Sequence, residues 1–144
     1  MTLAIKEMVY KTEWLTLDKA EVLSRGFYKG YDYLVVSYGI HPCAYIALEE
    51  GQPFYRACLC EDVDVQCHGG CTFVEWGYGK LFNHTYKVIG WDYGHCYDFS
   101  GSSIKWGTEW NARSKKWTTE EMVQECRDVI ERLYILEHPE LYYK

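Results

Sequence analysis

TTEEMVQECRDVIERLYILEHP, residues 118–139, is the stretch of this chain that decides its fold. Thr118 is followed three residues later by Glu121, a spacing typical of a helix start in which each side chain satisfies a backbone donor of the other residue. Apolar residues then recur at helical spacing and predict one buried face, made of Met122, Cys126, Val129, Ile130, Leu133 and Leu136. Pro139 cannot continue the helix. We therefore predict a long C-terminal helix over about 118–137.

The sequence before this helix has the character of β-strands. Residues 31–38 and 43–48 are rich in β-branched and aromatic side chains, and residues 72–76 and 86–91 repeat this pattern. Residues 18–24 fit two helical turns that end at Gly26. Residues 100–116 predict an exposed loop. The chain is thus expected to be α+β, with a mainly antiparallel sheet of four or five strands covered by the C-terminal helix.

Length and composition fit one globular domain over residues 1–144. A chain of 144 residues can bury a core, and 48% hydrophobic with 25% charged residues is ordinary for such a domain. Aromatic residues are abundant, with 14 Tyr and 6 Trp. Such rings fill cores, anchor interfaces and stack on planar ligands, so we expect a homo-oligomer with aromatic binding surfaces.

The charge of the chain limits its partners. The net charge is −6 and no basic stripe is visible, which argues against long nucleic acid but not against a small anion held by local cations. No apolar run reaches membrane length and residues 1–7 lack the shape of a signal peptide, so we expect a cytoplasmic protein with no membrane contact. Seven cysteines, an odd number, predict mostly free thiols.

Residues 67–98 hold the candidate site. CHGGCTF at residues 67–73 and GWDYGHCYD at residues 90–98 combine glycines with His68, Asp92, His95 and Asp98. Imidazoles and carboxylates suit a hydrolytic metal ion, held by His68, His95 and Asp98 with or without Asp92, or they act as acid and base. In a purely structural interpretation, Asp92 and Asp98 accept backbone hydrogen bonds at turns and His95 is a satisfied buried histidine.

The cysteines offer two further interpretations. Cys58, Cys60, Cys67 and Cys71 supply enough thiolates for a structural zinc, although their spacing departs from common zinc knuckles. A cysteine beside His68 or His95 could instead form a nucleophilic pair. Neither a nucleophile elbow nor a phosphate-binding P-loop occurs in the sequence.

A third group of residues suggests the binding of a nucleotide. Tryptophans and cations crowd into the segment that leads to the C-terminal helix: Trp106, Trp110, Arg113, Lys115, Lys116 and Trp117. Indole faces stack on bases, and cations beside a helix N-terminus hold phosphate. Arg56 is a further candidate cation. The structural alternative is a solvated loop whose tryptophans clamp it to the core. The candidate ligand-binding residues are His41, His68, Thr72, Trp91, Asp92, His95, Asp98, Trp106, Trp110, Arg113 and Lys116.

These segments resemble a group of small bacteriophage and prophage proteins. The shared pattern is a His-Pro turn, a His-Gly-Gly-x-Thr-aromatic segment, a Gly-aromatic-Asp-x-x-His-x-x-Asp segment and a C-terminal helix. Here the pattern covers His41-Pro42, residues 68–73, residues 90–98 and residues 118–136. Cys71 stands where the group usually has an aliphatic residue, so the group gives no support to a zinc site.

The resemblance implies a phage accessory protein that acts against host defence in the bacterial cytoplasm. Our leading hypothesis is a binding protein that sequesters a nucleotide immune signal, such as a cyclic ADP-ribose isomer or a cyclic dinucleotide. It needs no cofactor. The alternatives are a phosphodiesterase that uses His68, Asp92, His95 and Asp98, and an acidic inhibitor of a host nuclease.

Overall fold

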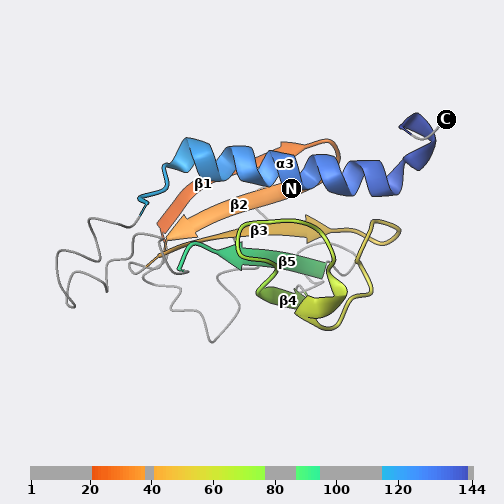
Figure 1. The fold of residues 1–144 in the computed structure, drawn as a ribbon, viewed down its shortest axis with the longest axis horizontal. Helices are drawn as coiled ribbons and strands as arrows, with labels where there is room; N and C mark the ends of the chain where they lie inside the picture. Colours follow the sequence, from red (N-terminus) through yellow and green to blue (C-terminus); the bar gives the residue numbers. More distant parts are fainter. Residues whose placement is uncertain (1–20, 38–40, 77–86, 95–114, 143–144) are drawn as a thin grey trace.

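The computed structural model of the chain describes residues 21–37, 41–76, 87–94 and 115–142 (Figure 1). Five strands form one antiparallel sheet in the order β1-β2-β3-β5-β4. The strands are β1 (Glu21–Tyr28), β2 (Tyr31–Ser37), β3 (Pro42–Leu48), β4 (Phe73–Trp76) and β5 (Lys87–Asp92). In this described part of the chain, one long helix is present, α3 (Thr119–Glu137), together with the short 3-10 turns η2 (Cys60–Asp62) and η5 (Pro139–Leu141). The predicted α+β class is confirmed.

One core lies between the sheet and α3. The helix covers β1, β2 and β3, as Figure 1 shows. Its predicted face is buried at Met122, Cys126, Val129, Ile130 and Leu133. The connection between β3 and β4 covers the rest of this face with Ala57, Val63 and Val65. The opposite face of the central strands is also shielded from solvent, at Leu34, Val36, Cys43, Tyr45, Ala47 and Val88.

The start of α3 matches the prediction. Thr118 Oγ1 accepts a hydrogen bond from the Glu121 amide at 3.2 Å, and Glu121 Oε1 accepts from the Thr118 amide at 3.1 Å. The prediction for Leu136 was wrong, since that side chain is 53% exposed. Glu137 holds the last turn against the sheet instead, because its Oε1 accepts a hydrogen bond from the buried Tyr31 hydroxyl at 3.0 Å.

The predicted helical turns at residues 18–24 were also wrong for the described part, because Glu21 begins β1. A two-residue turn after Tyr28 explains why residues 21–28 form a strand, because the turn pairs this segment with β2. Lys29 and Gly30 both have positive φ, 47° and 91°, which is the backbone of a tight hairpin. Gly26 does not end a helix. It lies in β1 opposite Tyr33, whose phenol occupies the space of a side chain at position 26.

Candidate functional site

The structure brings the two glycine-containing segments together at the end of β5. The Thr72 amide donates to the Gly90 carbonyl at 2.9 Å, and the Thr72 hydroxyl donates to Asp92 Oδ2 at 3.0 Å. The other oxygen of this carboxylate, Oδ1, accepts from the Gly94 amide at 3.0 Å. Asp92 therefore joins the end of β5 to the segment that precedes β4. Its bond from the Gly94 amide is the backbone hydrogen bond at a turn that the structural interpretation of the sequence proposed.

Three aromatic rings meet beside this junction and form what we term the ring cluster: His68, Tyr93 and Trp117. The His68 imidazole stacks on the Tyr93 phenol, with centroids 4.6 Å apart and planes 12° apart. The Trp117 indole meets His68 edge-on at 4.9 Å and Tyr93 at 5.3 Å. Tyr93 is buried, whereas His68 and Trp117 are half-buried. The cluster thus joins two part-exposed rings to the core through a third ring.

Trp91 lies beneath the ring cluster rather than on the surface. Its side chain is 1% exposed, and its indole nitrogen donates to the Tyr93 hydroxyl at 3.1 Å. Successive residues of a strand point to opposite faces. Trp91 and Tyr93 therefore share the helix-facing side of β5, and the Asp92 side chain lies on the other side. In this arrangement Trp91 orients Tyr93, which in turn supports His68.

His41 borders the same junction from the start of β3. The Tyr93 amide donates to the Pro42 carbonyl at 2.9 Å, which brings the His-Pro turn alongside the end of β5. A Cβ at Gly94 would lie 2.7 Å from the His41 ring, so this glycine gives the imidazole its space. The His41 Nδ1 atom is 3.9 Å from Cys43 Sγ. Burial raises the pKa of the Cys43 thiol to about 12, which keeps it protonated at neutral pH.

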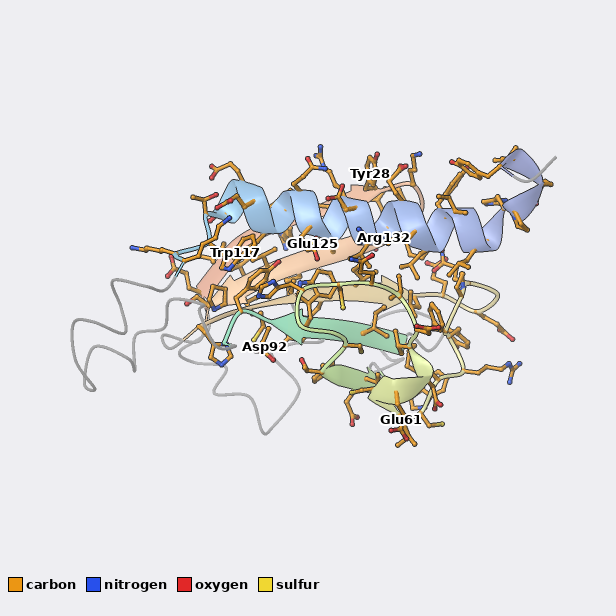
Figure 2. The ribbon with its side chains drawn as sticks, in the orientation of Figure 1. Tyr28, Glu61, Asp92, Trp117, Glu125 and Arg132 are labelled. Carbon is orange, nitrogen blue, oxygen red and sulfur yellow. The ribbon has the colours of Figure 1, made fainter. Side chains whose placement is uncertain are left out.

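Lys115 and Lys116, which precede α3, bring two cations to the end of the molecule where the ring cluster lies. Figure 2 labels Trp117 near the start of α3 and Asp92 at the end of β5, both on the same side. Lys115 Nζ lies 3.9 Å from the centre of the Trp117 ring and forms an ion pair with Glu121 at 2.7 Å. Because Glu121 already brings a carboxylate to the helix N-terminus, a phosphate would depend on the lysines more than on the helix amides. Lys116 is exposed.

No group of three metal-binding side chains is present in residues 21–37, 41–76, 87–94 and 115–142. His95 and Asp98, which the metal interpretation requires, lie outside the described residues, as do Trp106, Trp110 and Arg113.

The described cysteines are all free thiols. Burial raises the pKa of Cys67 to about 12 and also raises that of Cys71, so a cysteine nucleophile next to His68 is not favoured.

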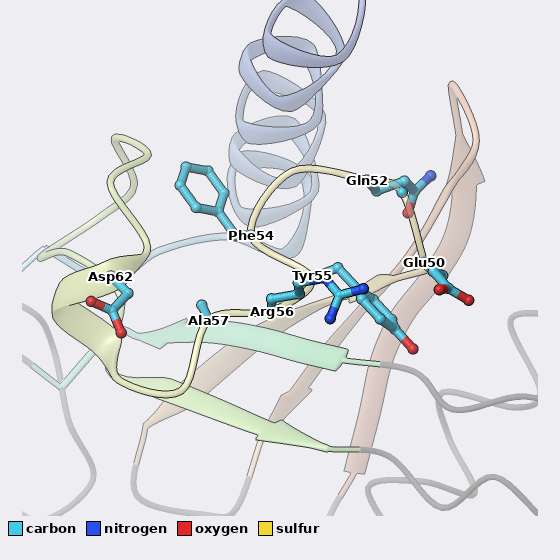
Figure 3. Close-up of a pocket in the computed structure, with 8 residues that line it drawn as sticks. Glu50, Gln52, Phe54, Tyr55, Arg56, Ala57 and Asp62 are labelled. Carbon is cyan, nitrogen blue, oxygen red and sulfur yellow. The ribbon is translucent and has the colours of Figure 1, made fainter.

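A concave region lies away from this junction and was not predicted from the sequence (Figure 3). The connection after β3 surrounds an open hollow of about 600 Å³, which we term the loop hollow. It is lined by Glu50, Gly51, Gln52, Phe54, Tyr55, Arg56, Ala57 and Asp62. Only Arg56 had been singled out as a possible cation. Phe54 adopts a positive φ of 65°, a strained backbone for a bulky side chain that sequence alone does not reveal.

Comparisons of the chain with protein-family models, with curated proteins and with solved structures gave no match. None of the helices in the described parts of the chain is long and apolar enough to cross a membrane. The function must therefore be argued from the sites themselves.

Proposed function

We propose that this protein binds and sequesters a small, anionic, nucleotide-derived molecule, of the kind represented by cyclic ADP-ribose isomers and cyclic dinucleotides. The observation that carries the proposal is the ring cluster. His68 and Trp117 are part-exposed, they are held in fixed mutual orientation by the buried Tyr93, and an ammonium group lies 3.9 Å from the indole. Rings fixed before binding lose little freedom when a base stacks on them.

The polar groups around the cluster suit the other parts of such a ligand. Lys116 would contact phosphate oxygens, and Arg113 is a second candidate from the sequence. Thr72 and His41 lie at the same end of the sheet but on the Asp92 side of β5, so their hydroxyl and imidazole would reach only a ligand that extends past the end of β5. Asp92 would act mainly by holding Thr72 in place, because each of its oxygens already accepts a hydrogen bond.

The proposed biological setting follows from the sequence resemblance to phage and prophage proteins. A phage protein that removes a nucleotide immune signal would act in the host cytoplasm, where the signal is made. A homo-oligomer would serve this role well, because facing copies can enclose a small ligand more completely than one open surface. The phage origin, the host cytoplasm and the homo-oligomer are therefore parts of the proposal, as the ligand class is.

The test is to mix the purified protein with a panel of cyclic ADP-ribose isomers and cyclic dinucleotides and measure affinity by calorimetry. The bound fraction is then denatured and analysed by mass spectrometry. We expect one ligand class to bind and to be released intact. Fragments that accumulate with turnover would support the phosphodiesterase alternative, and loss of that turnover with a chelator would assign it to a metal.

Two variants link binding to the ring cluster. Loss of one stacking ring costs about tenfold or more in affinity, which we expect for His68→Ala. His138→Ala is the matched control, because His138 is a part-exposed histidine at the far end of α3. Equal affinities of the two variants would reject the ring cluster as the site. Absence of binding by the whole panel, with co-purification of a host nuclease, would favour the inhibitor alternative.

A further inference from the structure

The loop hollow is fixed in shape before any ligand arrives. Consecutive turns hold its wall, with the Tyr55 amide donating to the Gln52 carbonyl at 3.2 Å and the Ala57 amide donating to the Phe54 carbonyl at 2.9 Å. The Gln52 side chain accepts from the Glu49 amide at 2.7 Å and donates to the Gly30 carbonyl at 3.3 Å. The segment is therefore tied both to itself and to the β1–β2 hairpin.

The floor of the loop hollow is anchored to the sheet. Lys87 is 1% exposed, its ammonium group donates to the Ala57 carbonyl, and it lies 3.8 Å from the centre of the Trp76 ring. Tyr55 packs edge-on against the same tryptophan at 5.2 Å. These contacts hold Tyr55 and Ala57 in place from below. A strained Phe54 next to such a rigid floor fits a position maintained for binding, because backbone strain tends to collect at ligand contacts.

The charges of the loop hollow have a mixed pattern. The Arg56 guanidinium is exposed and forms no ion pair with any residue that the structure describes. In Figure 3 the guanidinium lies against the Tyr55 ring, with Glu50 on the same side of the view and Asp62 on the opposite side. Neither carboxylate forms an ion pair within the described ranges, although Asp62 Oδ2 accepts from the Leu59 amide at 3.2 Å. The lining of the loop hollow thus carries one cation and two carboxylates.

This pattern selects against a phosphate dianion and in favour of a zwitterion. A planar guanidinium matches a carboxylate through two parallel hydrogen bonds. A dianion in the hollow would be repelled by these two carboxylates, whereas an ammonium group would be attracted by them. The Tyr55 ring supplies an apolar surface beside the guanidinium, and Phe54 lines the hollow on the side toward α3. We infer that the loop hollow is a second binding site, independent of the ring cluster, for a small zwitterion with an apolar side chain, such as an aromatic α-amino acid.

The experiment is a titration followed by nuclear magnetic resonance, with L-phenylalanine as the probe. We expect saturable shifts confined to residues 50–62. Phenylalaninamide lacks the carboxylate and N-acetylphenylalanine lacks the ammonium group, so each should bind about tenfold more weakly or worse. Arg56→Gln should lower the affinity to the same extent. Arg25→Gln is the matched control, because Arg25 is an exposed arginine in β1, away from the loop hollow.

Three outcomes would overturn the inference: no saturable binding of L-phenylalanine, equal binding of its amide, or tighter binding of adenosine monophosphate at the same residues. The two sites are tested separately. His68→Ala should leave the phenylalanine titration unchanged, and Arg56→Gln should leave the nucleotide calorimetry unchanged. Failure at one site therefore does not decide the other.

Discussion

Asp32 makes the stability of this protein depend on pH in an unusual direction. The residue lies in β2, is 3% exposed, and its Oδ1 atom has no hydrogen-bond partner among the described residues. Burial, with a smaller contribution from the nearby Glu49 carboxylate, raises the pKa of Asp32 from 3.8 to about 6. The folded protein therefore keeps a proton on Asp32 at acidities where the unfolded chain has already released it.

The sign and the size of the effect follow from proton linkage. Between pH 4 and pH 6 the unfolded chain binds fewer protons than the folded chain, so stability falls as pH rises. The contribution of Asp32 is fully present below its unfolded pKa and is lost as pH rises through about 6. A difference of about two pKa units corresponds to about 3 kcal/mol of unfolding free energy lost by pH 7.

Asp32→Asn tests this reasoning, because an amide cannot ionise. Urea unfolding at several values between pH 4 and pH 7 should show that the variant gains about 3 kcal/mol relative to the unmodified protein across this range. The comparison across pH cancels any constant cost of burying the amide. Asp64→Asn, at an exposed carboxylate, is the control and should follow the unmodified protein. Parallel stability curves for Asp32→Asn and the unmodified protein would refute the argument.

Three further changes should lower stability, each measured by urea unfolding at pH 7. Gly90→Ala places a Cβ 2.6 Å from the Tyr45 ring and should cost about 1–3 kcal/mol, so an unchanged midpoint would contradict the packing described for this strand. Thr118→Ala removes the N-cap of α3 and should cost about 1 kcal/mol, whereas Thr118→Ser should cost little. Lys87→Ala removes the group that anchors Ala57 and should cost about 2 kcal/mol or more, with the largest rise in amide exchange at residues 54–57.

The sequence predicted those elements whose pattern repeats along the chain. The helix from Thr118 onward and the four strands after Gly30 follow local periodicity, and the structure places them within a residue or two. The strand β1 was missed because Val22, Leu23 and Ser24 are compatible with either structure, and its partner β2 decides between them. The signal that could have identified it was Lys29-Gly30, two turn residues between two aromatic positions.

The sequence predicted which two segments carry the candidate site, but not the side-chain contacts within it. Sequence spacing indicated that residues 67–73 and 90–98 carry related chemistry, and the described parts of these segments do meet at Asp92 and Thr72. Spacing could not indicate that Tyr93 would stack under His68, because that contact depends on the register of β5 against β3. The loop hollow was missed for a similar reason. Its lining comes from turns whose shape depends on the buried Lys87, which is distant in sequence.

Gly90 and Gly94, the glycines of the second segment, make room for neighbouring side chains in the structure. A glycine allows close approach to the backbone, either by a ligand or by a neighbouring side chain. In the structure, Gly90 gives space to the Tyr45 ring, and Gly94 gives space to the His41 ring. Tyr45 in turn packs edge-on against Phe73 at 5.1 Å, on the partner strand β4. Gly90 therefore lets β3, β4 and β5 pack closely, and Gly94 makes room for the His-Pro turn. The ligand contacts that we propose fall on side chains near this packing, so the unfolding free energy of His68→Ala should be measured together with its affinity, because His68 also stacks on the buried Tyr93.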